Sequence, residues 1–462
     1  MRGRKDLMED RQEQLRSERI GTLLLKFSIP AIVGMLVNAL YNIVDRIFIG
    51  QGVDAFAITG IGVVFPIMTI IMAFGMLVGI GSTSLISIRL GEKRQDEAEH
   101  ILGNAFILLV IVSLAITFFG LIFIDPLLLI FGASPDTIGY AKDYIIIILY
   151  GTIFNALGFG LNNIIRAEGN PKAAMLTMLL GAIINTVLDP IFIFVFDMGV
   201  KGAAYATVIG QLANTIYVLS YFNSKRSILK LHKKNMKLSK EIIIGIFSIG
   251  MSPFAMQLAA SVVQLLSNNA LKIYGGDLAI GAMSIISSAV TIFFMPIFGI
   301  NQGAQPIIGY NYGAKQYDRV KHAMKLAVGA ATVISLIGFI SVQVFPQAII
   351  RIFNNDSELI RIGTHGIRIY LAMMPIIGFQ IVSANYFQAI GKAKISMFLS
   401  LLRQVTLLIP LLIILPPIFG LTGVWMSAPV SDFISVIITG IYVWRDMRKL
   451  DQEHALILAM QK

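Results

Sequence analysis

Long apolar segments recur along this chain from Thr22 almost to the C-terminus, and no other feature of the sequence constrains the fold as strongly. A helix that crosses the hydrocarbon core of a bilayer needs about 20 mostly apolar residues. Only 14% of the 462 residues are charged, whereas soluble domains carry roughly 25%. The segments predict an all-α membrane protein with twelve transmembrane helices, over the approximate ranges 21–49, 56–88, 98–124, 137–165, 172–196, 200–222, 241–273, 278–310, 319–346, 357–390, 394–416 and 421–445.

Lysines and arginines gather in the loops on one side of these spans. Most of the 37 lie there, while the opposite loops hold only Lys201, Lys272 and Arg351. The positive-inside rule places both termini in the cytoplasm, so the net charge of +11 needs no nucleic-acid partner to explain it. The first 26 residues carry many charges and no apolar h-region, which predicts a retained first span. We expect a prokaryotic inner or plasma membrane protein, and the absence of Cys excludes disulfides and thiolate metal sites.

An internal repeat divides the chain into two halves. The stretch LGEKRQDEAEH (90–100) resembles YGAKQYDRVKH (312–322), and RAEGNPKAAM (166–175) resembles QAIGKAKISM (388–397), both at an offset of 222. We therefore expect two pseudo-symmetric six-helix lobes around a central cleft, an N-lobe over 1–222 and a C-lobe over 241–462. A cytoplasmic basic linker over 223–240 joins them. Parallel repeats of this kind bind substrate between the lobes and rock to give alternating access. A duplicated scaffold without transport is the alternative.

Polar side chains inside the first-half spans follow helical spacing, so they share faces. Pro30 precedes the first of these stripes and favours a bend there. The polar positions are Asn38, Tyr41, Asn42 and Asp45 in the first span, Tyr144 and Asn162 in the fourth, Asn185 and Asp189 in the fifth, and Thr207 and Gln211 in the sixth.

Asp45 and Asp189 fall at similar depth in the outer half of the membrane. An ionised Asp near the bilayer centre costs on the order of 3 kcal/mol, so such residues normally face protein or water. Burial and a second nearby acid both favour the neutral carboxyl, which predicts proton exchange. Alternatively, Asp45, Asn185, Asp189 and Thr207 form an oxygen-rich set for Na⁺. Each acid could also serve structure alone, through a local ion pair such as Asp45 with Arg46 or through a helix cap.

The second half has no equivalent acid in its first span, which offers Gln257 and Gln264 instead. Asp432 and Arg403 are its main charges within the spans, and we interpret them as packing partners. Ion coupling is therefore expected in the first lobe. Met256, Met283 and Phe293 would give a soft, polarisable lining for flat hydrophobic cations. For each of these apolar residues, ordinary core packing is the alternative.

Several motifs resemble those of the multidrug and toxic compound extrusion (MATE) family. They are NQGAQPIIGYNYGAKQYDRVKHA (301–323), YNIVDRIFIG (41–50), RAEGNPKAAM and NTVLDP (185–190). The resemblance implies a secondary antiporter that expels organic cations against inward H⁺ or Na⁺. It also implies coupling roles for Asp45, Asn185 and Asp189, a cavity completed by Tyr144, Asn162 and Thr207, and a bending point at Pro30.

The resemblance is closer to the DinF-like branch of that family, which is usually thought to be proton-coupled, because the seventh and tenth spans lack the acids of the NorM branch. We expect a monomer that binds cationic or amphiphilic drugs and membrane lipids, with no cofactor beyond the coupling ion. A lipid-linked glycan flippase is the alternative transporter, although such proteins usually carry a cationic cavity. An intramembrane enzyme lacks sequence support, since no Walker A, H-E-x-x-H or G-x-S-x-G motif is present. Loops too short to hold a signalling domain argue against a receptor or scaffold.

Overall fold

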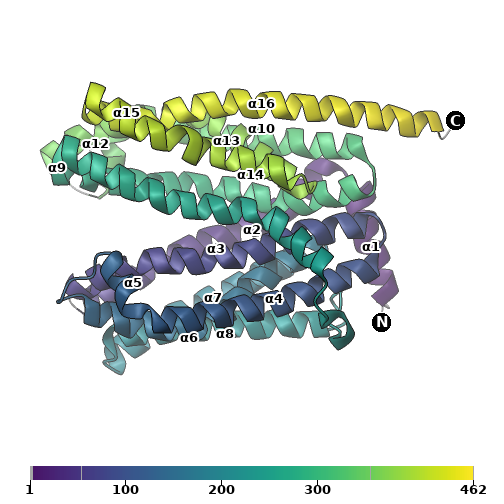
Figure 1. The fold of residues 1–462 in the computed structure, drawn as a ribbon, viewed down its shortest axis with the longest axis horizontal. Helices are drawn as coiled ribbons and strands as arrows, with labels where there is room; N and C mark the ends of the chain where they lie inside the picture. Colours follow the sequence, from purple (N-terminus) through teal and green to yellow (C-terminus); the bar gives the residue numbers. More distant parts are fainter. Residues whose placement is uncertain (1–3, 54, 354, 461–462) are drawn as a thin grey trace. The chain divides into compact units, whose positions relative to one another are not determined.

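The computed structural model describes residues 4–53, 55–353 and 355–460, which form helices and no strands (Figure 1). This confirms the predicted all-α class. The helices of the first half are α1 (Arg4–Ser17), α2 (Ile20–Gly52), α3 (Ala55–Gly91), α4 (Gln95–Ile122), α5 (Ile124–Ile130), α6 (Ile138–Ala167), α7 (Pro171–Pro190), η1 (Ile191–Val195), α8 (Gly199–Asn223) and η2 (Lys233–Met236). Those of the second half are α9 (Lys240–Gly313), α10 (Tyr317–Val344), α11 (Pro346–Arg351), α12 (Ser357–Tyr370), α13 (Met374–Ala389), α14 (Ala393–Leu401), η3 (Leu402–Leu408), α15 (Ile409–Phe419) and α16 (Leu421–Met460).

Among the described residues, nine helices are long and apolar enough to cross a membrane, or ten if α12 and α13 form one span bent by 51°. Pro375 lies at the start of α13 and cannot continue the hydrogen bonding of α12, which accounts for the bend. Helix α9 has 74 residues, roughly 110 Å of helix, which is too long for one crossing. Gly276 interrupts it with φ 66° and ψ −167°, a conformation open to glycine. With α8, these helices are consistent with the twelve predicted spans.

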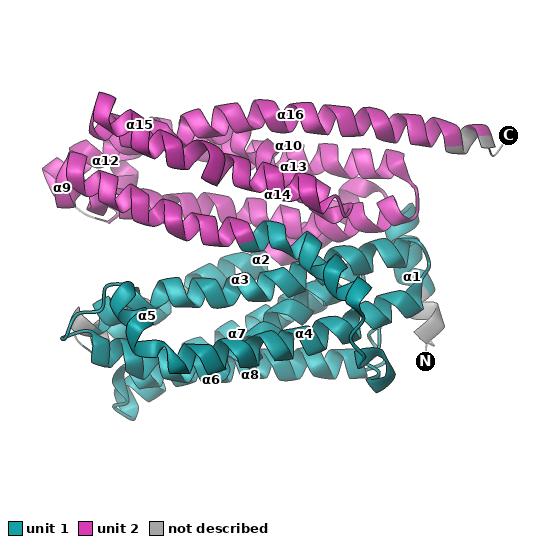
Figure 2. Cartoon of the chain, viewed as in Figure 1, with its two compact units in different colours: residues 1–18, 33–254 teal, residues 19–32, 255–462 magenta. Residues whose placement is uncertain are grey.

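The chain forms two compact units (Figure 2). Unit 1 contains residues 1–18 and 33–254, and unit 2 contains residues 19–32 and 255–462. Helix α2 therefore passes from unit 2 to unit 1 two residues after Pro30, and α9 passes from unit 1 to unit 2 after Phe254. The division into functional N- and C-lobes with the bounds given above stays a prediction.

The start of α9 belongs to unit 1 because its backbone packs directly on α3. A Cβ at Gly250 would lie 1.7 Å from the Leu77 carbonyl oxygen, and one at Gly81 would lie 2.1 Å from the Ile246 carbonyl oxygen. Only glycine permits such close contact between two helices.

The internal repeat is visible in the backbone. Helices α4 and α10 begin and end 222 residues apart, at Gln95 and Tyr317 and at Ile122 and Val344. The turns before them place Lys93 and Lys315 at φ 61° and 58°. Gly169 and Gly391, after α6 and α13, adopt φ 92° and 76°. The N–H groups of these four residues bond to carbonyls three residues earlier, as in a Schellman motif. The identical Lys and Gly of the repeat thus encode the same helix ends in both halves.

Candidate functional site

The centre of the candidate site lies near the end of α7. Asn170 caps the start of this helix by accepting a hydrogen bond from the Ala173 N–H, and Pro171 occupies its first turn. The helix ends at Pro190, directly after Asp189, and continues as the π-helix η1. Asp189 is fully buried.

Asn185 links this acid to α8. Its side-chain amide donates to Asp189 Oδ1 at 3.4 Å and to Thr207 Oγ1 at 3.3 Å. Asn185 and Thr207 are both buried. The Asn185 amide therefore links α7 to α8. Its contact with Asp189 follows from their spacing of one helical turn within α7.

The contact between α7 and α8 depends on two glycines one to two turns from the site. A Cβ at Gly210 would lie 2.7 Å from the Gly181 carbonyl oxygen and 3.3 Å from the Asn185 Cβ. Because neither glycine has a side chain, the two backbones approach closely enough for Asn185 to reach Thr207.

We predict that Gly210→Ala pushes α7 and α8 apart, since overpacking costs about 1–3 kcal/mol. The Asn185–Thr207 contact should lengthen and transport should fall by about tenfold, the loss of ~1.4 kcal/mol. Thermal unfolding and the initial rate of dye transport measure the two effects. Gly62→Ala in α3 is the matched control, because a Cβ there meets nothing within 4 Å. Equal behaviour of the two variants would contradict the role given to Gly210.

A second acid reaches the same place from α2. Asp45 is 9% exposed, and its carboxyl group is close enough to that of Asp189 for a hydrogen bond between them. Tyr144 of α6 is buried beside both acids and shares a hydrogen bond with Thr207. Four helices of unit 1 thus bring together Asp45, Tyr144, Asn185, Asp189 and Thr207.

This cluster presents oxygen atoms with spare hydrogen-bonding capacity. Asn185 Oδ1 and Asp189 Oδ2 are buried, and no described donor reaches them. Among the described side chains, no Lys or Arg forms an ion pair with Asp189. Two carboxyl groups this close cannot easily both be ionised. The described residues contain no group of three or more His, Cys, Asp or Glu that could hold a metal ion, so a cation here would rely on amide and hydroxyl oxygens as well.

Asn162 lies elsewhere. Its amide donates to the Ala174 carbonyl oxygen at 2.6 Å and to the Thr177 hydroxyl, and its oxygen accepts from Arg166 at 2.9 Å. Thr177 is twelve residues before Asp189, roughly 18 Å along α7. The structure therefore does not bring Asn162 to the acid pair, because it lies too far along α6 from Tyr144.

The residues predicted to bind substrate are distributed over both units. Tyr41 lies close to Tyr144, Asn38 is exposed, and Gln211 has a buried oxygen that no described donor reaches. The side chain of Asn42 lies outside the described part of the chain. In unit 2, Gln264 is exposed and donates to Asn268 at 3.0 Å, while Met256 and Gln257 are half-buried.

Met283 and Phe293 belong to the packed apolar core of unit 2, together with Trp425. The Phe293 ring also packs against Gly338, where a Cβ would lie 3.0 Å from it. This arrangement favours core packing, the alternative that the sequence left open for both residues.

Asp432 and Arg403, the charges predicted within the spans of the second half, are paired with each other in unit 2. Asp432 of α16 is almost fully buried and accepts from Arg403 Nε, which lies in the π-helix η3. Ser431 donates to the Arg403 carbonyl oxygen at 2.6 Å. Unit 1 therefore holds an acid pair, while unit 2 holds a neutral ion pair.

A repeated bundle of membrane-length helices with an acid pair buried in one unit is typical of multi-pass membrane transporters. The MatE family profile matches residues 30–191 and 253–414, once in each half. The chain belongs to this family of multidrug efflux transporters.

Relatives agree with this assignment. The chain is 29% identical over 438 residues to the multidrug export protein MepA of Staphylococcus haemolyticus, covering 95% of this chain and 96% of the relative. It is 28% identical to MepA of Staphylococcus aureus strain N315, over 93% and 95% of the two chains. Both names describe export of more than one drug by those proteins.

Two solved structures share the fold. The multidrug transporter DinF-BH, solved in complex with a ligand, is 42% identical, with a TM-score of 0.88 over 93% of this chain and 96% of the other. A transporter of the MOP superfamily from Pyrococcus furiosus is 25% identical, with a TM-score of 0.90 over 95% and 98%. The likeness to DinF-BH agrees with the DinF-like branch expected from the sequence.

Proposed function

We propose that this protein exports hydrophobic organic cations in exchange for inward H⁺, and that Asp45 and Asp189 carry the coupling ion. The observation that supports this most directly is the buried acid pair, whose carboxyl groups lie within hydrogen-bonding reach of each other. Asn185, Thr207 and Tyr144 surround the pair and fix its position.

The proposed cycle alternates the charge of unit 1. Protonation of the acid pair from outside neutralises the site, weakens the binding of a cationic drug and favours its release outward. The protein then changes from its outward-open to its inward-open state and exposes the acids to the cytoplasm. Loss of the proton there restores negative charge for the next cation. A ligand can shift such an equilibrium only through different affinities for the two states, and the charge of the acids supplies that difference.

Pro30 is the proposed bending point of α2. It removes one backbone hydrogen bond inside the helix, and α2 passes from unit 2 to unit 1 two residues later. Asp45 lies about four turns further along the same helix. Asp45 and the bend at Pro30 therefore lie on one helix, through which a change at the acid pair is transmitted to the bend.

Transport by purified protein in liposomes tests the function. We expect ethidium to move only when a pH gradient is imposed, and to move equally well after Na⁺ is replaced by choline. Movement that depends on Na⁺ at a fixed pH gradient would instead assign the site to Na⁺, through Asp45, Asn185, Asp189 and Thr207. Ethidium movement without any ion gradient would contradict ion-coupled export.

A further inference from the structure

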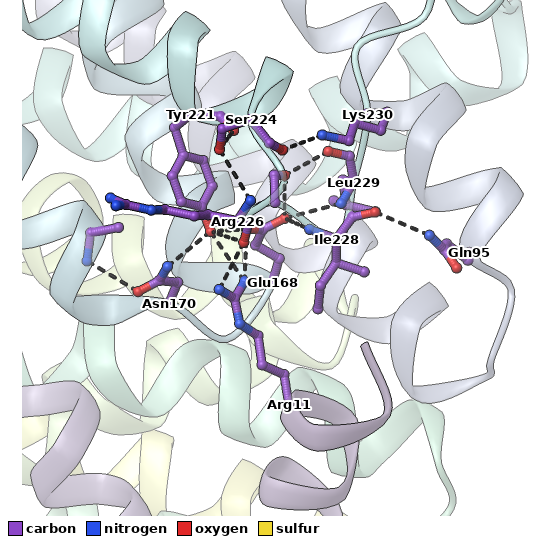
Figure 3. Close-up of polar contacts among 12 residues, drawn as sticks. Arg11, Gln95, Glu168, Asn170, Tyr221, Ser224, Arg226, Ile228, Leu229 and Lys230 are labelled. Carbon is purple, nitrogen blue, oxygen red and sulfur yellow. Dashed lines mark hydrogen bonds and ion pairs between the residues drawn. The ribbon is translucent and has the colours of Figure 1, made fainter. Parts of the chain in front are cut away.

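A second buried carboxylate in unit 1 lies far from the acid pair, at the end of α6. Glu168 follows the last residue of that helix, and its side chain is fully buried. Figure 3 shows it at the centre of a polar cluster. Its oxygens accept hydrogen bonds from five groups: the Arg11 guanidinium, the Tyr221 hydroxyl, the Ser227 hydroxyl, and the N–H groups of Ile228 and Leu229.

These donors offset a large cost. Burial raises the pKa of the Glu168 carboxyl, whereas the Arg11 guanidinium and the Tyr221 hydroxyl act in the opposite direction. A buried carboxylate without partners would be strongly unfavourable. The partners therefore offset the cost of burying this carboxyl group only while the segments that supply them remain in place.

One of these segments is the loop predicted to be a basic linker between the halves. The Ile228 and Leu229 N–H groups donate to Glu168 Oε2 at 3.1 Å each, and Gln95 donates to the Ile228 carbonyl oxygen at 3.1 Å. Ile228 and Leu229 are themselves buried. Further along, Asn104 of α4 donates to the Lys237 carbonyl oxygen at 3.1 Å and accepts from the Ser239 N–H at 2.8 Å. The linker is thus bound to unit 1 along its length.

The other segment is the N-terminal helix α1. Arg11 donates to Glu168 Oε1 at 3.0 Å and to the Arg226 carbonyl oxygen at 2.8 Å. Its guanidinium therefore contacts both the acid and the linker. The segment that follows α1, from Arg19 to Ile32, already belongs to unit 2.

We propose that Glu168 is a positioning residue that fixes α1 and the loop between α8 and α9, residues 224–239 of the predicted linker, as parts of unit 1. The inference rests on the proposed transport cycle. With both segments fixed, changes between the units occur where the chain passes from one unit to the other: after Glu18, after Ile32 in α2 and after Phe254 in α9. Pro30 and Pro253 lie within two residues of the passages in α2 and α9. Release of α1 would loosen the connection after Glu18, where the chain enters unit 2, and slow the cycle.

Cysteine accessibility tests the anchor directly, because the chain contains no Cys of its own. Ile228→Cys places a single thiol at a position that is 2% exposed. We expect slow maleimide labelling in this background and labelling at least ~10-fold faster when Glu168→Ala is added, since local opening sets access to buried groups. Glu168→Gln, which keeps the acceptor oxygen but loses the charge, should give an intermediate rate and covers the case in which Glu168→Ala does not fold.

Asp446→Asn is the matched control. Asp446 of α16 is a buried carboxylate of unit 2 that accepts from Tyr386 at 2.7 Å and pairs with Lys392, and both of these partners lie outside the linker. The Asp446→Asn variant should leave labelling of Ile228→Cys unchanged.

In liposomes, Glu168→Ala should lower the maximal ethidium flux while the half-saturating concentration stays within ~2-fold, as expected when binding is intact and the cycle is slower. Unchanged labelling in both Glu168 variants, or equal acceleration by Asp446→Asn, would overturn the anchor. Failure of the wild-type chain to transport would overturn the proposed function alone, since labelling does not depend on it.

Discussion

Asp189→Asn should abolish ion-driven ethidium transport while leaving the fold intact. The substituted side chain has the same shape, and its oxygen can still accept the hydrogen bond from Asn185. It cannot release a proton, and Asp45 loses the neighbouring acid that favours its neutral form, so the site no longer changes charge between the two ends of the cycle. We expect the initial rate to fall by at least ~100-fold, about 2.7 kcal/mol. The measurement is uptake of ethidium into liposomes under an imposed pH gradient.

Asp143→Asn is the control for this variant. Asp143 precedes Tyr144 in α6, but its side chain is 49% exposed and pairs with Lys201 at 3.3 Å. It should transport at the wild-type rate. Both variants should melt near the wild-type temperature, because Asn has nearly the same size and shape as Asp and the Asp143 side chain is largely exposed. Full transport by Asp189→Asn would remove this residue from the coupling site.

The largest effect on stability is expected at the buried ion pair of unit 2. Asp432→Leu or Arg403→Met alone leaves one charge buried without its partner, at a cost of about 3–5 kcal/mol. The double variant removes both charges and should recover most of that loss, because buried ion pairs can often be replaced by apolar residues at little cost. Denaturant or thermal unfolding of the two single variants and the double variant gives the coupling energy.

The exposed pair of Arg361 and Glu358 in α12 provides the comparison, since surface ion pairs contribute little. Arg361→Met should unfold close to the wild-type temperature. If the Arg403 and Asp432 variants are no less stable than Arg361→Met, the pair does not hold α16 to η3. If the double variant retains transport, the pair serves packing, as the sequence led us to expect.

The repeat and the all-α class could be predicted because both are written in local sequence. The length of an apolar segment is enough to predict a membrane helix. The identical Lys and Gly at an offset of 222 mark helix ends that need a positive φ. The interruption of α12 and α13 was not predicted, because Pro375 is compatible with a single long span as well as with a bent one.

The site was predictable only in part. Helical spacing assigns Asn185 and Asp189 to one face of α7, but it gives no distance to another helix. That distance is set by the contact of Gly181 with Gly210. The same limit explains Asn162, which shares a helix with Tyr144 but lies several turns away. The role of Glu168 could not be predicted, because its partners come from α1, α8 and the loop after α8, segments that are far apart in the sequence.

Proton release on drug binding tests the central claim most directly. Ethidium would be added to purified protein in weakly buffered solution near neutral pH, and the released protons would be counted against the drug bound. We predict release from the wild-type chain and from Asp143→Asn, and none from the variant in which Asp45 and Asp189 are both Asn. Drug binding by the wild-type chain without proton release, or equal release from the double variant, would contradict coupling through this acid pair.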